Sequence, residues 1–214
     1  MAKANLMARG CLLIACVATV LAPTTGALAE VVDPIVDAVW KPQRVNFEYR
    51  GYGTLYTCGS LEDKLEAILE RIGAREDLRV GGYACDDQIG IARFHIDFNS
   101  PVEATPDNIR ALTAYDARDV LIARARAETL ASPEDLAHFP AIWKTVSFAR
   151  DRKLKLQAGD CELVRQLRRQ VLSRMSVRIV TDRVHCSSAF GNIGPPRLTV
   201  SALVPAPASI AVGD

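Results

Sequence analysis

The sequence predicts an α+β fold of two tandem β-α-β-β units, each closed by one internal disulfide and joined by a mainly helical connector. Three observations predict this fold. Four cysteines follow an N-terminal targeting segment, and they form two pairs of similar spacing. A tryptophan precedes the first cysteine of each pair by the same distance. After that cysteine, both segments change from strand-like alternation to the period of an amphipathic helix.

Residues 1–29 have the features of a signal peptide. Lys3 and Arg9 precede an apolar run at residues 10–22, which is too short to span a bilayer as a helix. Small residues follow this run, so we expect cleavage after Ala29. The mature protein would then be periplasmic or secreted.

A lipoprotein is the minor alternative for the N-terminus. The stretch "LIAC" ends at Cys16 and resembles a bacterial lipobox, which would make Cys16 a lipidated residue. Only a few apolar residues precede this stretch and another apolar run follows it, so cleavage after Ala29 fits better. The 185 residues after Ala29 suffice for one domain or two small ones.

The cysteines of the mature chain are expected to form disulfides. An even number of cysteines in an oxidising compartment indicates a disulfide framework, although four cysteines allow three pairings. Cys58 and Cys85 are 27 positions apart, and Cys161 and Cys186 are 25 apart. Because these two intervals contain the same succession of patterns, we expect Cys58 to pair with Cys85 and Cys161 to pair with Cys186.

The two predicted units cover residues 44–103 and 143–205. Trp40 and Trp143 each lie 18 positions before the first cysteine of a pair. In each copy one apolar helical face follows that cysteine. These faces consist of Leu61, Leu65, Ile68, Leu69 and Ile72, and of Val164, Leu167, Val171, Leu172 and Met175. Asp160 is the candidate N-cap of the second helix. The shared order of elements suggests a duplication.

The connector at residues 104–142 is expected to be mainly helical and to pack over the sheet. Thr105 before a proline and Ser132 before a proline are typical helix starts. Between them, helix-forming residues place three apolar side chains on one side: Val120, Leu121 and Ala125. Residues 30–43 are expected to form an N-terminal extension and residues 206–214 a C-terminal tail.

Charge is unevenly distributed along the chain. Residues 30–143 hold 12 basic and 20 acidic side chains, whereas residues 144–183 hold 11 basic and 4 acidic ones. The mature chain is nearly neutral, so no general charge argument favours nucleic acid. A candidate face for an anionic partner consists of Arg165, Arg168, Arg169 and Arg174. The alternative is that these arginines solvate a helix or complement the acidic segment.

The sequence shows no recognisable catalytic motif. It has neither a phosphate-binding loop nor a hydrolase nucleophile elbow, and it lacks closely spaced metal-binding Cys or His pairs. Cys161 at a helix start could be a reactive thiol, but the even cysteine count favours a half-cystine. His95 lies on the polar side of a strand beside Asp97, where a surface pair is expected. We therefore predict no catalytic residue, no cofactor and no metal ligand.

The stretches "FEYRGYGTLYTCGSLEDKLEAILERIGAREDLRV" and "GDCELVRQL" resemble a family of exported proteobacterial proteins without an assigned activity. The resemblance covers most of the mature chain. It includes a tyrosine two residues before the cysteine of the first helix and an Asp-Cys-Glu-Leu start of the second. It implies a location in the bacterial envelope and transfers no functional residue.

These observations favour a periplasmic, non-enzymatic binding or envelope-assembly module with an envelope protein as partner. One alternative is an envelope hydrolase whose site does not form a sequence motif. Another is a peripheral protein that binds anionic membrane surfaces through the four arginines. The sequence does not predict an oligomeric state.

Overall fold

The computed structural model describes residues 34–51, 54–85, 90–186 and 194–207. They belong to one compact unit that spans residues 33–214. The predicted signal peptide, its cleavage point at Ala29 and the lipobox cysteine Cys16 lie outside the described residues, as does most of the predicted tail.

One antiparallel sheet of six strands forms the centre of the fold. The strands are β1 (Val36–Arg50), β2 (Arg79–Cys85), β3 (Ile91–Glu103), β4 (His138–Ser147), β5 (Val177–Arg183) and β6 (Arg197–Pro205). Their order across the sheet is β2-β3-β1-β4-β6-β5, and every neighbouring pair is antiparallel. The predicted α+β class is confirmed.

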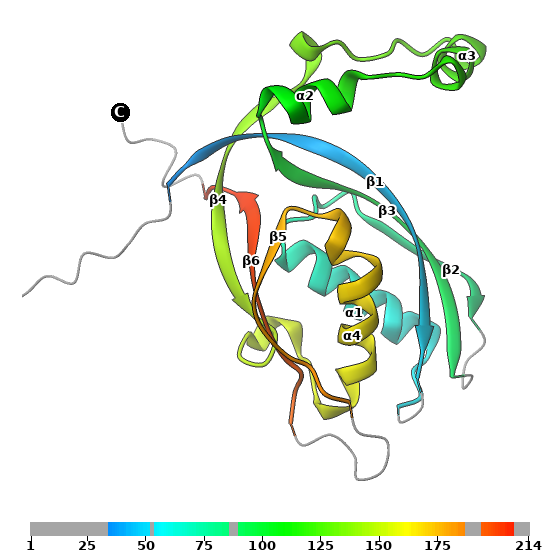
Figure 1. The fold of residues 1–214 in the computed structure, drawn as a ribbon. Helices are drawn as coiled ribbons and strands as arrows, with labels where there is room; N and C mark the ends of the chain where they lie inside the picture. The colour runs from blue at the N-terminus through cyan, green and yellow to red at the C-terminus, as the bar shows by residue number, and fades with distance from the viewer. Residues whose placement is uncertain (1–33, 52–53, 86–89, 187–193, 208–214) are drawn as a thin grey trace, which may run out of the picture. The chain divides into compact units, whose positions relative to one another are not determined.

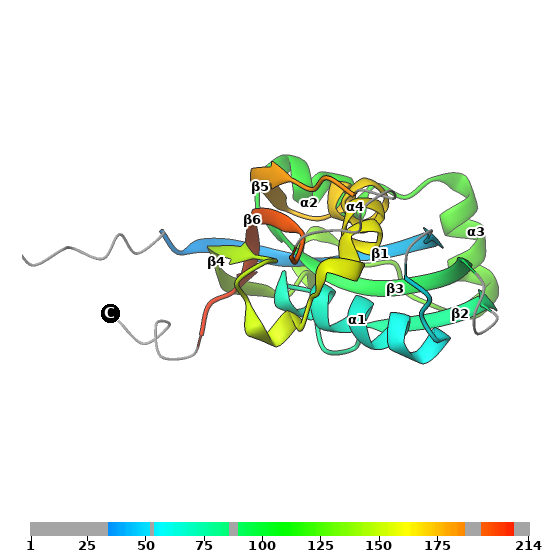
Figure 2. The same ribbon diagram turned by 90° about the horizontal axis from the view of Figure 1, so that it is seen from below.

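The helices occupy two places relative to this sheet. The α-helices are α1 (Cys58–Arg71), α2 (Pro106–Thr113), α3 (Ala117–Arg126) and α4 (Cys161–Gln170). Four short 3-10 helices are η1 (Pro133–Asp135), η2 (Arg152–Leu154), η3 (Ala158–Asp160) and η4 (Leu172–Arg174). Figure 1 shows α1 and α4 on the concave side of the curved sheet and α2 and α3 beyond one end of it, and Figure 2 shows α1 and α4 from below.

The two halves of the sheet have the same order of elements and the same pairing. In the first half β3 lies between β1 and β2, and in the second β6 lies between β4 and β5. The halves meet where residues 36–39 of β1 pair with residues 138–141 of β4. Strands β1 and β4 both begin before residues 44 and 143, where the predicted units start. The additional residues are mostly apolar and pair with each other across this seam.

The predicted helical faces form most of the core. All ten apolar residues predicted on the two faces are buried, as are the inward residues of β1 and β3. The predicted alternation of β3 is confirmed, because Phe94, Ile96 and Phe98 are buried between more exposed neighbours. Burying these side chains is the main favourable contribution to folding.

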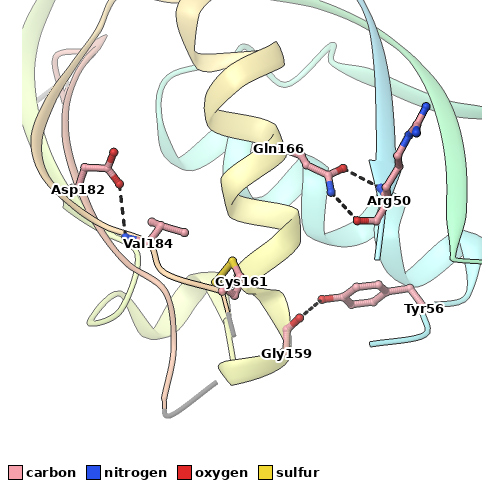
Figure 3. The surroundings of a disulfide bond; sticks show 8 residues. Arg50, Tyr56, Gly159, Cys161, Gln166, Asp182 and Val184 are labelled. Carbon is pink, nitrogen blue, oxygen red and sulfur yellow. Dashed lines mark hydrogen bonds between the residues drawn. A yellow bond between two sulfur atoms is a disulfide. The ribbon is translucent and has the colours of Figure 1, made fainter. Parts of the chain in front are cut away.

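Helix α4 hydrogen-bonds to the free edge of β1. Beyond the seam, β1 pairs with β3 on one side, and two glutamines of α4 bind its backbone on the other. The Gln170 side chain accepts from the Glu48 N–H and donates to the Glu48 carbonyl, both at 2.8 Å. Gln166 does the same for the Arg50 backbone at 2.7 and 2.5 Å (Figure 3). The two side-chain amides therefore replace a missing strand.

Both outermost strands are interrupted by a β-bulge. The register of β2 shifts between Gly82 and Ala84, and that of β5 shifts between Ile179 and Thr181. The residues at these bulges, Tyr83 and Val180, are exposed. Bulges at sheet edges oppose pairing with another chain, so these edges are poor sites for strand addition.

The connector is helical as predicted, but it does not pack over the sheet. The Thr105 hydroxyl accepts from the Asn108 N–H and caps α2, as expected. Helix α2 has no buried residue, and α3 buries only Ala123. The expected packing is wrong because α1 and α4 already fill the concave face of the sheet.

The replacement Gln170→Leu tests the contact between α4 and β1. It leaves the Glu48 N–H and carbonyl without their partners, so we expect the free energy of unfolding to fall by about 2 kcal/mol. Urea unfolding followed by circular dichroism measures this loss. The matched control, Arg169→Leu, changes an exposed neighbour and should shift stability by less than about 0.5 kcal/mol. Equal effects of the two variants would contradict the role of Gln170.

Candidate functional site

The two predicted disulfides are present. Cys58 is bonded to Cys85 and Cys161 to Cys186, with Cα–Cα distances of 5.9 and 5.5 Å. In each pair one cysteine is the first residue of a helix, and the other lies at or just after the end of the next strand. Cys161 is therefore a half-cystine and not a nucleophile, and Figure 3 shows its surroundings.

A buried carboxylate precedes α4 and connects the two halves of the fold. Asp160 is 2% exposed. Its carboxylate accepts hydrogen bonds from the Tyr56 hydroxyl, from Lys64 Nζ at 3.1 Å and from the Gln157 N–H at 2.6 Å. Asp160 occupies the predicted N-cap position, but its side chain makes no cap hydrogen bond to α4. It instead binds the loop before α1 and the middle of α1.

The tyrosines of this cluster stay protonated. Burial raises the pKa of Tyr56 far above its usual range, and the hydrogen bond to Asp160 raises it further. Burial also raises the pKa of Tyr49, with a smaller contribution from the negative charge of Glu162. The Tyr56 hydroxyl is thus a permanent donor, also 3.3 Å from the Gly159 carbonyl (Figure 3). With its carboxylate bound by three donors, Asp160 fits a structural clamp better than a general base.

The four arginines of the predicted anionic-partner face do not form one exposed surface. Arg168 is ion-paired with Asp182 of β5. Arg165 is only partly exposed, whereas Arg169 and Arg174 are exposed. Half of the residues of α4 are buried, and Arg169 is the one exposed arginine of that helix.

The histidines make separate local contacts. His95 stacks on Tyr83 at 4.1 Å between ring centroids, and its Nδ1 lies 2.7 Å from Asn46 Oδ1. The expected pair of His95 with Asp97 is wrong, because Asp97 binds Arg44 instead. The described residues contain no group of three or more His, Cys, Asp or Glu side chains placed to hold a metal ion.

Helix α3 presents an apolar surface that the sequence analysis missed. Val120 and Leu121, predicted to face the sheet, are 40% and 63% exposed, and Ile122 is 38% exposed. A capping box between Asp116 and Asp119 holds the start of this helix. The apolar pattern is visible in the sequence, but only the position of the connector shows that no part of the described fold covers it.

Two cationic residues accompany this apolar surface. Arg118 and Arg124 are exposed, and neither forms an ion pair within the described part of the chain. At 100° per residue, Ala117, Leu121 and Ala125 lie along one line on the helix, with Arg118 and Arg124 beside it. We call this surface, residues 117, 118, 121, 122, 124 and 125, the α3 crest. Within the described residues, no helix has the length and hydropathy needed to cross a membrane.

Replacing both Cys161 and Cys186 with serine tests the contribution of the second disulfide. Because the bond closes a loop of 25 positions, its loss should lower the free energy of unfolding by about 3.5 kcal/mol. Urea unfolding without reductant measures the change. The double serine variant of Cys58 and Cys85 serves as the comparison and should lose a similar amount. A loss below about 1 kcal/mol for the Cys161 and Cys186 variant would contradict a stabilising bond.

The variant Asp160→Asn tests the clamp. Lys64 and the Gln157 N–H bind one oxygen of the carboxylate and the Tyr56 hydroxyl binds the other, so an amide must direct its N–H group at one of these two sides. The change also removes the negative charge beside Lys64, and we expect a loss of about 2 kcal/mol in unfolding free energy. Thermal and urea unfolding measure it. Lys64→Met is the control: Asp160 keeps two donors and the loss should be about half as large. If Asp160→Asn proves neutral, the carboxylate does not clamp the two halves.

Comparison with known proteins assigns no family: no family model matches the chain, and neither a curated protein nor a solved structure does. The resemblance to exported proteobacterial proteins therefore stays a prediction.

Proposed function

We propose that this protein is an exported, non-enzymatic binding or assembly module that docks on an envelope protein through the α3 crest. The single observation that carries the proposal is the exposure of Leu121 and Ile122 in the α3 crest, on a helix that buries only Ala123. An exposed cluster of large apolar side chains is costly in water, and such patches commonly mark interaction sites.

The geometry of the α3 crest fits a helix-in-groove contact. Leu121 lies between Ala117 and Ala125, four residues away on either side, so small side chains allow close approach to a partner. Arg118 and Arg124 would lie at the rim of such an interface, where arginine is common. The partner best suited to this crest is a protein groove with an apolar floor and acidic edges.

Export supports an envelope location for this activity. The predicted signal peptide and two disulfides are consistent with an oxidising compartment. The disulfides also remove every cysteine of the described residues from thiol chemistry. A thiol-dependent hydrolase therefore receives no support, and the arrangement of the α4 arginines gives little support to a basic membrane-binding face on that helix.

We also infer that the two β-α-β-β units arose by duplication. The equal tryptophan-to-cysteine distances, the shared disulfide placement and the same strand pairing in both halves support this proposal. If the two units are duplicates, the connector is the segment that neither unit repeats. A segment added between two copies of a folding unit can acquire a binding role without disturbing the core.

Photo-crosslinking in the intact envelope tests the proposed docking. A photoreactive amino acid at Leu121 should capture one discrete protein, whereas the same residue at exposed Arg110 of α2 should not, since Arg110 lies outside the α3 crest. The additional change Ile122→Glu should abolish capture by placing a charge in the apolar contact.

Three results would overturn the proposal. They are no protein captured at position 121, equal capture at both positions, and capture that survives Ile122→Glu. Crosslinking of position 121 to lipid alone would instead assign the α3 crest to the membrane surface.

A further inference from the structure

A groove lies at the C-terminal end of α1, away from α3. Two adjoining cavities of about 380 and 400 Å³ form it, and both are lined by Glu70, Ala74 and Pro205. The first is bordered in addition by Ala67, Arg71, Gly73, Lys144, Lys153 and Val204. The second is bordered by Trp40, Arg75 and Glu76. The groove therefore has a cationic end and an aromatic end.

The cationic end contains more positive charge than its carboxylates neutralise. Asp151 is ion-paired with Arg71, and its other oxygen accepts from the Lys153 N–H at 3.0 Å. Burial opposes ionisation of Asp151, but the hydrogen bond from Arg71 and nearby positive charges lower its pKa overall. Lys144 and Lys153 form no ion pair with any residue that the structure describes. Glu70 also lines this cavity, so the cations Arg71, Lys144 and Lys153 outnumber the carboxylates of Asp151 and Glu70.

Lys144 occupies an unusual position for a lysine. It lies between Ile142 and Val146 on the strand face that packs against the core, and it is only partly exposed. Burial lowers its pKa, and the charges of Arg71 and Lys153 lower it further, although Asp151 opposes them. A partly buried ammonium among other cations is stabilised when an anion binds beside it.

The sequence context agrees with this placement. Lys144 and Lys153 belong to the segment at residues 144–183 that carries the excess of basic side chains. The arginines of α4 do not form a binding face that would explain this excess of basic side chains. The groove contains two other basic residues of the segment, Lys144 of β4 and Lys153 of η2, beside the last turn of α1.

We propose that this groove binds a phosphate group, held by Lys144 and Lys153, with the organic body of the ligand extending toward Trp40. Lysine binds phosphate as a point charge and does not need the planar geometry of arginine. At the far end, Arg75 lies over the Trp40 ring at 5.4 Å, and Phe139 stacks on Trp40 at 4.5 Å. These contacts hold the indole as one wall of the groove. Glu70, which lines both cavities, can accept a hydrogen bond from a hydroxyl of the ligand.

The probes are inorganic phosphate, glycerol 3-phosphate and vesicles containing phosphatidylglycerol, titrated into the full-length mature protein. Isothermal calorimetry and NMR shifts of the lysine side chains should show saturable binding of glycerol 3-phosphate, tighter than that of inorganic phosphate and weakened by salt. Binding of the soluble probes alone would assign the site to free phosphates, and tighter binding of vesicles would assign it to lipid headgroups.

The test variant carries both Lys144→Gln and Lys153→Gln. The matched control is Lys41→Gln, which changes an exposed lysine outside the groove. The double variant should weaken binding of glycerol 3-phosphate at least about tenfold, and Lys41→Gln should leave it unchanged. Removing crowded cations is not expected to unfold the protein, and Lys153→Gln alone provides a milder version. Absence of saturable binding, or binding by the double variant as tight as that of the unmodified protein, would overturn the proposal. The crosslinking result at Leu121 is independent of this outcome.

Discussion

The structure depends on how the free edge of β1 is satisfied. The two halves of the sheet share a seam of four residue positions on each strand, and beyond it β1 has a strand neighbour on one side only. Backbone N–H and carbonyl groups left buried without partners would each cost about 1–3 kcal/mol. The Gln170 side-chain amide removes that cost at the part-buried Glu48, and Gln166 pairs with the more exposed backbone of Arg50. Helix α4 must therefore lie against β1 with one particular rotation. The second half is thereby attached to the first by a helix as well as by strands.

Other contacts hold α4 in this rotation. The bond of Cys161 to Cys186 ties its first residue to the chain after β5, and Asp160, just before it, binds Tyr56 and Lys64 from the other half. Arg168 pairs with Asp182 on β5. Cys161 and Arg168 lie on one side of the helix and the two glutamines lie on roughly the opposite side, so together these contacts restrict its position. Of the basic side chains of α4, Arg168 is thereby used within the fold, whereas Arg165 is partly exposed and Arg169 is exposed.

Elements that carry their own periodicity were predictable from the sequence. The helical faces after Cys58 and Cys161, the alternation of β3 and the disulfide pairing all follow from local patterns, and the structure confirms them. Contacts across distant segments were not predictable in this way. Nothing near Gln170 in the sequence indicates that it binds Glu48, 122 positions away. The same holds for the groove, since Lys144 is recognisable as a strand residue while its inward direction depends on register and on the placement of α1.

The connector shows why an apolar pattern alone does not place a helix. Val120 and Leu121 look like core residues, and a helix that buried them against the sheet would gain about 1.5–3 kcal/mol for each. The outer face near the seam already has its own small cluster around Ala38, Ala141 and Leu203, and the concave face is filled by α1 and α4. The described part of the sheet therefore has no uncovered apolar face on which the connector helices could pack. A partner that covers α3 would recover the burial that the fold does not provide, which gives the exposed helix a thermodynamic reason to bind.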